Sequence, residues 1–86
     1  MKRLSELISS LTIEELLGDT TREISKITFD SRQAEPGALF VAVRGTSVDG
    51  HSFIPQVIAA GATAVVCEEI PNTRESNVTY IKVPNS

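Results

Sequence analysis

Two short polar segments carry the side chains that could bind a charged ligand. The first is Asp30-Ser31-Arg32, in which the Ser31 hydroxyl could donate to a phosphate oxygen and the Arg32 guanidinium could make a forked, charge-assisted contact. The same residues also fit a plain turn, in which Asp30 caps backbone groups and Arg32 pairs with it. Taken alone, these three residue types favour the turn.

The second segment, residues 45–52 with the sequence GTSVDGHS, almost matches the phosphate-binding pattern G-x-x-x-x-G-K-[ST]. His51 stands where that pattern needs its lysine, and an aspartate two residues earlier adds a negative charge. The sequence therefore predicts no ATP site here. Two interpretations remain: a turn with two glycines and an aspartate cap, or a loop whose main-chain groups at Thr46, Ser47 and Val48 hold a polar ligand such as a uracil edge.

The remaining reactive side chains form no catalytic group. His51 and Cys67 are the only histidine and cysteine, and neither has a second ligand at metal-binding spacing, so no metal site is predicted. We expect His51 to make a hydrogen bond in the first turn of a helix, and Cys67 to be a core residue rather than a nucleophile. The acidic pairs Glu14-Glu15 and Glu68-Glu69 are typical of solvated surface.

Strands are expected to position both polar segments. Residues 23–30, in which Ile27 and Phe29 alternate with polar neighbours, predict a strand that ends at Asp30-Ser31-Arg32. Residues 38–43 are apolar on both faces, which is typical of a central strand, and follow a tight turn at residues 35–37. Ligands of α/β sheets usually bind at the carboxyl ends of strands.

Helical spacing precedes and follows these strands. An opening helix is predicted from the apolar residues Leu4, Leu7, Ile8 and Leu11. Residues 13–17 predict a short helical or irregular turn. A second helix is predicted from the apolar stripe Phe53, Ile54, Val57 and Ile58, with Asp49 as its N-cap and Gly61 just after its C-cap.

Two further strands complete the predicted fold, at residues 62–67 and 78–83. The strand–helix–strand unit from Leu39 to Cys67 favours a right-handed parallel crossover in a mixed sheet. We therefore predict an α/β fold, a small mixed β-sheet packed with helices, in a single domain over residues 1–86.

Composition and charge limit the partners. Lys and Arg number 8 and Asp and Glu number 11, for a net charge of −3 without a basic tract, which argues against nucleic acid and an anionic membrane surface. No apolar run approaches the length needed to cross a bilayer, and the first residues lack a secretory signal. A single cysteine fits a reducing compartment, so we expect a cytoplasmic protein.

Several blocks of the sequence, in order, resemble the N-terminal domain of the Mur ligases, cytoplasmic enzymes that add amino acids to the UDP-linked peptidoglycan precursor. The blocks are ITFDSR at 27–32, PGALFVA at 36–42, Gly45, DGHSFI at 49–54 and GATA at 61–64. The resemblance covers roughly residues 24–68 and the tail at 78–83. It is strongest to the UDP-N-acetylmuramoyl-tripeptide synthetase branch, which adds the third peptide residue to UDP-N-acetylmuramoyl-L-alanyl-D-glutamate.

The resemblance implies that this domain holds the UDP part of the substrate. The positions that match the family's nucleotide contacts are Phe29, Ser31, Thr46, Ser47 and Val48. Ser31 would bind the diphosphate and Phe29 would line the site near the uridine. Arg32 belongs to the motif and is a candidate accessory residue.

The resemblance also implies that this chain is the N-terminal part of a three-domain ligase. The family's ATP loop, carbamylated lysine and amino-acid-binding domain would follow Ser86, so these residues alone should be inactive. The parent would use ATP and magnesium to activate a carboxylate as an acyl phosphate, and the central and C-terminal domains would be its partners. Alternatives are the D-alanyl-D-alanine-adding branch and a free-standing nucleotide- or protein-binding module.

Overall fold

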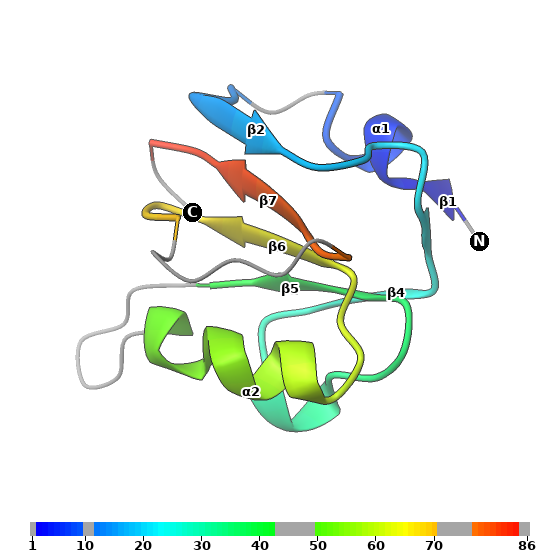
Figure 1. The fold of residues 1–86 in the computed structure, drawn as a ribbon, viewed down its shortest axis with the longest axis vertical. Coiled ribbons are helices and arrows are strands. Elements are labelled where there is room, and N and C mark those ends of the chain that lie inside the picture. Colours follow the sequence, from blue (N-terminus) through cyan, green and yellow to red (C-terminus); the bar gives the residue numbers. More distant parts are fainter. Residues whose placement is uncertain (1, 10–11, 43–49, 71–76, 85–86) are drawn as a thin grey trace.

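The computed structural model describes residues 2–9, 12–42, 50–70 and 77–84 (Figure 1). A five-stranded sheet forms its centre, in the order β2-β7-β6-β5-β4. The strands are β2 (Glu15–Leu17), β4 (Lys26–Thr28), β5 (Ala38–Val41), β6 (Ala64–Cys67) and β7 (Thr79–Lys82). The strands β4, β5, β6 and β7 pair in parallel, and β2 is antiparallel to β7. The predicted mixed sheet packed with helices is confirmed.

The connection from β5 to β6 contains the second predicted helix, as η2 (Gly50–Phe53) followed by α2 (Ile54–Ala59). The helix ends at Gly61, which has a φ of +107°. Its N–H donates to the Ile58 carbonyl at 3.0 Å, and the Ala62 N–H donates to the Val57 carbonyl at 3.0 Å. This is a Schellman motif, so the predicted glycine stop is confirmed. The predicted cap, Asp49, lies outside the described residues.

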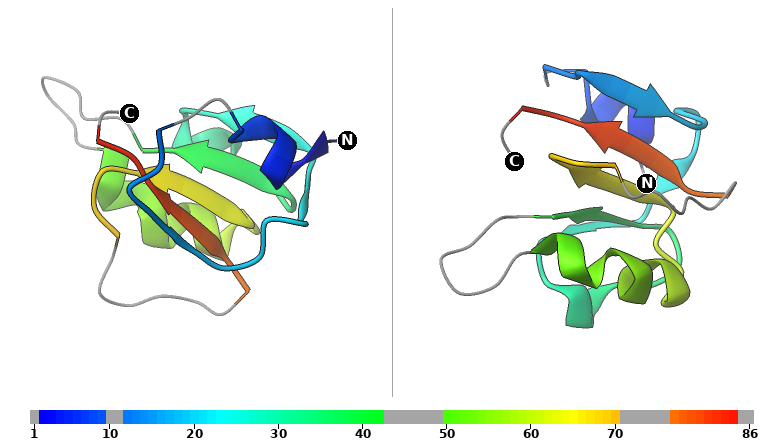
Figure 2. Two further views of the ribbon diagram at one scale, coloured as in Figure 1. Left: turned by 90° about the horizontal axis from the view of Figure 1, so that it is seen from above. Right: turned by 60° about the vertical axis from the view of Figure 1, so that its left-hand side comes forward.

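Alternating side chains of the strands form two cores, one on each face of the sheet. The first core lies under α2, and its largest members are Phe40, Ile54, Val57, Val65 and Tyr80. The second lies under α1 (Leu4–Leu7), and its members include Leu4, Ile8, Leu39, Val66 and Ile81. Figure 2 shows α1 and α2 on opposite sides of the sheet. Burial on both faces explains the continuous apolar sequence of β5 and β6.

The N-terminal region differs from the prediction. The first helix covers only Leu4–Leu7 and follows β1 (Lys2–Arg3), which pairs with β3 (Glu23–Ile24). The expected helical or irregular turn at residues 13–17 is wrong, because residues 15–17 form β2. Backbone pairing with β7 decides this, and it directs neighbouring leucines to opposite cores.

The single strand predicted at residues 23–30 is interrupted at Ser25. The Ser25 N–H donates to the Gly37 carbonyl at 2.9 Å and its hydroxyl donates to the Pro36 carbonyl at 3.1 Å. The expected turn at residues 35–37 is confirmed, with Pro36 followed by Gly37 at a φ of +86° and the Ala38 N–H donating to the Glu35 carbonyl at 3.0 Å. The turn therefore aligns the start of β5 with β4.

The parallel strands place their carboxyl ends along one edge of the sheet (Figure 1). Residues 29–32 follow β4 at this edge, and residue 42 follows β5. The register pairs Thr28 with Phe40, so the two chain segments leave the sheet side by side. The fold thus brings the Asp30-Ser31-Arg32 segment to the edge at which β5 ends.

Candidate functional site

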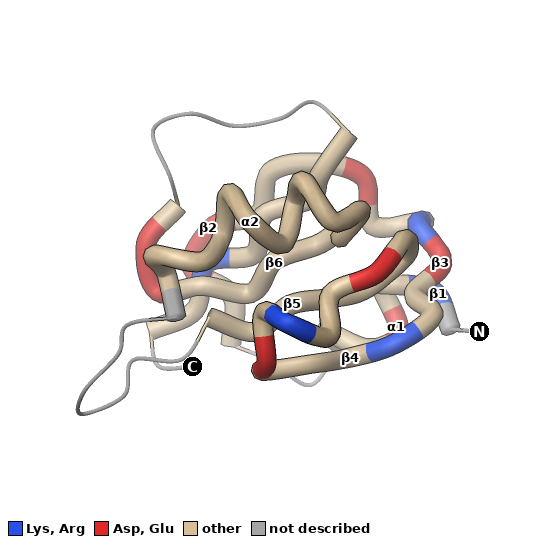
Figure 3. Tube along the Cα trace, turned by 90° about the horizontal axis from the view of Figure 1, so that it is seen from below, with Lys and Arg blue, Asp and Glu red and all other residues tan. Residues whose placement is uncertain are grey.

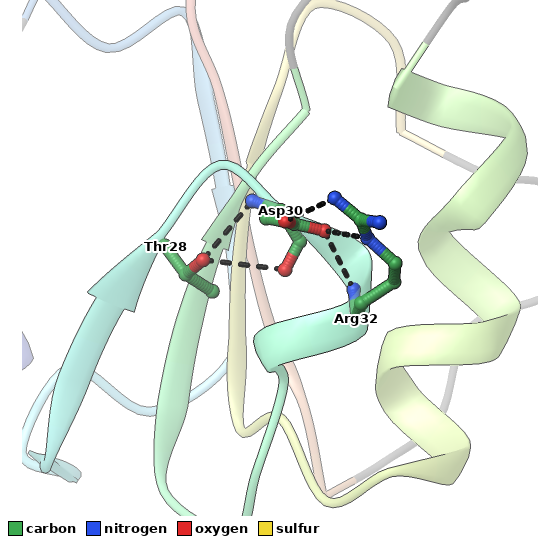
Figure 4. A network of polar contacts seen from close by, with 3 residues as sticks. All are labelled: Thr28, Asp30 and Arg32. Carbon is green, nitrogen blue, oxygen red and sulfur yellow. Dashed lines mark hydrogen bonds and ion pairs between the residues drawn. The ribbon is translucent and has the colours of Figure 1, made fainter.

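The segment after β4 is a capped turn. Residues Ser31–Gln33 form the short 3-10 helix η1, and Asp30 is its N-cap. The Asp30 Oδ1 accepts from the Arg32 N–H at 2.9 Å and from the Arg32 Nε at 3.1 Å, and Arg32 Nη2 donates to Oδ2 at 3.0 Å (Figure 4). The turn interpretation therefore describes the geometry of Asp30 and Arg32. It leaves the ligand role of Ser31 untouched.

Thr28 fixes the backbone of this turn. Its hydroxyl accepts from the Asp30 N–H at 3.0 Å and donates to the Asp30 carbonyl at 3.2 Å (Figure 4). Thr28 is buried and Asp30 is half-buried, so these bonds are partly sheltered from water. The sequence reasoning missed Thr28, although a threonine two residues before an aspartate at a strand end is a recognisable local signal.

The electrostatics of the turn follow from the same contacts. The hydrogen bonds from Arg32 lower the pKa of the Asp30 carboxyl below its ordinary value, and Asp30 raises the pKa of the Arg32 guanidinium. Both groups are charged at neutral pH and their charges cancel. The Arg32 side chain is 85 % exposed, so the pair lies at the surface.

The structure places the predicted residues after β4 together at the carboxyl edge. Phe29 is 70 % exposed, although it is aromatic, and Ser31 is half-buried. An exposed aromatic side chain two residues before a serine suits a ligand that has an aromatic and an anionic part. The other predicted residues, Thr46, Ser47 and Val48, lie outside the described residues.

His51 makes a hydrogen bond that the sequence did not predict. The Glu68 N–H donates to its Nε2 at 2.9 Å, which joins η2 to the end of β6. The expected bond lay within the first turn of the helix, whereas this one spans 17 residues. This ring nitrogen accepts from a backbone N–H, whereas the lysine of an ATP loop donates to phosphate oxygens.

Cys67 lies in the core, as predicted. It is fully buried in β6, its thiol donates to the Ile81 carbonyl at 3.7 Å, and burial raises its pKa to about 11. A thiol with so high a pKa is a poor nucleophile. Across residues 2–9, 12–42, 50–70 and 77–84, no three His, Cys, Asp or Glu side chains gather as metal ligands, and no helix there is long and apolar enough to cross a membrane.

Comparison with known proteins shows which family this chain resembles. Residues 23–85 match the model of the Mur ligase family, catalytic domain. The chain is 52 % identical over 94 % of its length to the UDP-N-acetylmuramoyl-L-alanyl-D-glutamate--2,6-diaminopimelate ligase of Phocaeicola vulgatus, and 45 % identical over 96 % to the ligase of that name from Bacteroides thetaiotaomicron. It spans 17 % of the length of each relative.

Solved structures show the same fold. A crystal structure of MurF from Acinetobacter baumannii matches 72 % of this chain and 13 % of its own, with a TM-score of 0.64 and 32 % identity. MurF from Thermotoga maritima, in complex with ADP, matches 67 % of this chain and 13 % of its own, with a TM-score of 0.59 and 29 % identity. The family match covers residues 23–85, well over half of the chain, and the solved structures share its fold, so the chain belongs to the Mur ligase family.

Proposed function

We propose that this chain is the N-terminal domain of an ATP-dependent ligase of peptidoglycan synthesis, and that it binds the UDP part of UDP-N-acetylmuramoyl-L-alanyl-D-glutamate. The observation that carries the proposal is the 52 % identity, over 94 % of the chain, to a ligase named for that substrate. The names of these relatives favour 2,6-diaminopimelate as the third residue added. The enzyme would act in the cytoplasm, where UDP-linked precursors are made.

The carboxyl edge of the sheet supplies the proposed binding groups. Phe29 is 70 % exposed there and offers a ring face on which a pyrimidine can stack. The Ser31 hydroxyl would donate to the diphosphate, and the segment with Thr46, Ser47 and Val48, which follows the neighbouring strand β5, would complete the nucleotide site. The segment after β4 would therefore give the nucleotide one aromatic contact, from Phe29, and one hydroxyl contact, from Ser31.

ATP and magnesium would bind elsewhere in the longer ligase. The residues most similar to an ATP loop place a hydrogen-bond-accepting imidazole, His51, at the lysine position. In the parent enzyme, ATP would convert the substrate carboxylate to an acyl phosphate, and the incoming amine would displace the phosphate. This domain would contribute binding and orientation, and the central and C-terminal domains would be its partners.

Calorimetric titration of the full-length protein with UDP-N-acetylmuramoyl-L-alanyl-D-glutamate tests the site. The Phe29→Ala variant should bind at least roughly ten-fold more weakly, because a base–aromatic stack is lost. The matched control is Ile27→Ala, which removes another exposed apolar side chain of the same segment and should leave affinity unchanged. Equal affinities of wild type and Phe29→Ala would refute the proposed uridine contact.

The D-alanyl-D-alanine-adding branch is the second candidate, because solved structures similar to this chain include MurF proteins. An assay of the full-length protein separates the two branches. Addition of diaminopimelate to the dipeptide precursor supports the first, and addition of D-alanyl-D-alanine to the tripeptide precursor supports the second. A protein with neither activity would point to a free-standing binding module.

A further inference from the structure

The Asp30–Arg32 pair lies beside the serine proposed to bind a diphosphate, so its charges matter for binding. Three hydrogen bonds join the two side chains and the Arg32 backbone, at 2.9, 3.1 and 3.0 Å. The carboxylate thereby occupies Nε and Nη2, one complete edge of the guanidinium fork. Arg32 is therefore directed at Asp30.

Contacts within the turn hold the Asp30 carboxylate in place. Its carboxylate caps η1, and its N–H and carbonyl are both held by the buried hydroxyl of Thr28. An unpaired carboxylate fixed next to Ser31 would repel the negative charges of a diphosphate. The turn thus uses Asp30 for its shape, and a diphosphate bound at Ser31 would be repelled unless the charge of Asp30 were cancelled.

We propose that Arg32 is a positioning residue that cancels the charge of Asp30 and so allows a diphosphate to approach Ser31, without itself being a principal ligand contact. This inference rests on the proposed binding of the UDP moiety. It distinguishes two roles that the motif alone leaves open, because a direct contact and a charge-cancelling partner respond differently when Asp30 is also changed.

Charge rescue tests the inference on the full-length protein, with affinity for UDP-N-acetylmuramoyl-L-alanyl-D-glutamate measured by calorimetry. Arg32→Gln leaves Asp30 unpaired and should weaken binding roughly ten-fold at low salt. The double variant Asp30→Asn/Arg32→Gln removes both charges and keeps a side-chain oxygen that can cap η1. Its affinity should return to within about two-fold of the wild type.

A second ion pair, at the other end of β4, gives a matched control. Lys26 Nζ lies 3.4 Å from Glu35 Oε1, at the amino end of β4. Figure 3 shows basic and acidic positions at both ends of β4. Lys26→Gln removes the same charge as Arg32→Gln and also leaves a carboxylate unpaired, but at the opposite edge of the sheet. Its affinity should equal that of the wild type.

Salt dependence gives a second readout. The defect of Arg32→Gln should shrink as salt rises from about 0.02 M to about 0.5 M, because ions screen exposed charges. If the double variant binds as weakly as Arg32→Gln, or if Arg32→Gln binds normally, the charge-cancelling role is refuted. If the wild type does not bind the UDP precursor at all, it is the proposed function that fails.

Discussion

At the scale of single residues, the buried thiol of Cys67 should make the free energy of unfolding depend on pH. Burial raises its pKa from 9.0 to about 11, so the folded protein favours the neutral thiol. As pH rises above 9.0, the thiol of the unfolded chain ionises first, and the free energy of unfolding should fall until the pH passes about 11. Urea unfolding of wild type and Cys67→Ala across this pH range measures the fall in the free energy of unfolding that the thiol causes. A difference between the two that does not change with pH would contradict the assignment.

The Asp30 carboxyl gives a prediction of opposite sign. Arg32 lowers its pKa below the ordinary 3.8, so the folded state favours the charged carboxylate. The stability that this pair contributes should be complete above pH 3.8 and lost as pH falls through the lower folded pKa. Melting temperatures of wild type and Asp30→Asn should therefore converge in acid. Curves that stay parallel would show that ionisation of the Asp30 carboxyl does not contribute to stability.

Local chemistry explains what the sequence could predict about these residues. The capped turn at Asp30 depends on neighbours in the sequence, and the core position of Cys67 depends on hydrophobicity. Both features could therefore be predicted from the sequence. The bond from Glu68 to His51 depends on how β6 ends beside η2, so no spacing rule could reveal it. The spacing of Thr28 to Asp30 is a local signal for the bond between them, and an assignment of residue 28 to a strand does not include it.

At the scale of elements, β5 and β4 should differ sharply in their sensitivity to truncation. Phe40 on β5 is 1 % exposed, whereas Ile27 on the neighbouring edge strand is 51 % exposed. Phe40→Ala should lower the free energy of unfolding by about 3–5 kcal/mol, because it leaves a cavity in the core. Ile27→Ala is the control and should change it by less than about 1 kcal/mol. Equal effects would mean that β5 is not the buried strand.

The end of α2 depends on the glycine at its stop. Gly61 has a φ of +107°, and a Cβ there would lie 2.9 Å from the Pro36 Cα. Gly61→Ala should cost about 1–3 kcal/mol, because both the left-handed backbone and a neighbouring backbone oppose the methyl group. Ala60→Gly, one residue earlier at a φ of −81°, is the control and should cost about 1 kcal/mol or less. Denaturant unfolding compares the two variants. Equal losses in the free energy of unfolding would contradict the role given to the left-handed backbone of Gly61.

The errors at this scale came from pairing between distant segments. Leu16 and Leu17 fit helical spacing, but pairing with β7 at the edge of the sheet makes residues 15–17 a strand. Pairing of β1 with β3 also shortens the opening helix, whose first residue is Leu4. Propensity within a short window cannot outweigh such tertiary contacts, so the buried β5 and β6 were easier to predict than the edges.

At the scale of the whole molecule, Thr79 joins the N-terminal segment to the sheet. Its buried hydroxyl donates to the Asp19 carbonyl at 2.6 Å and accepts from Arg22 Nε at 3.0 Å. Thr79→Val keeps the shape but removes both bonds, and should cost about 1–3 kcal/mol in the free energy of unfolding.

Thr63, the residue directly before the neighbouring strand β6, provides a matched control. Its N–H and carbonyl are bonded to Ala38 and Thr79, but its buried hydroxyl has no hydrogen-bond partner among the residues that the structure describes. Thr63→Val should therefore be neutral or slightly stabilising. A loss of stability equal to that of Thr79→Val would contradict the joining role of the Thr79 hydroxyl.

The central claim is that the carboxyl edge of the sheet binds the uridine diphosphate end of the precursor. A crystal structure of the full-length protein with UDP-N-acetylmuramoyl-L-alanyl-D-glutamate measures this most directly. We expect the uracil ring in van der Waals contact with Phe29, and a diphosphate oxygen within hydrogen-bond distance of the Ser31 hydroxyl. A nucleotide bound on the α1 or α2 face of the sheet, away from both residues, would contradict the account.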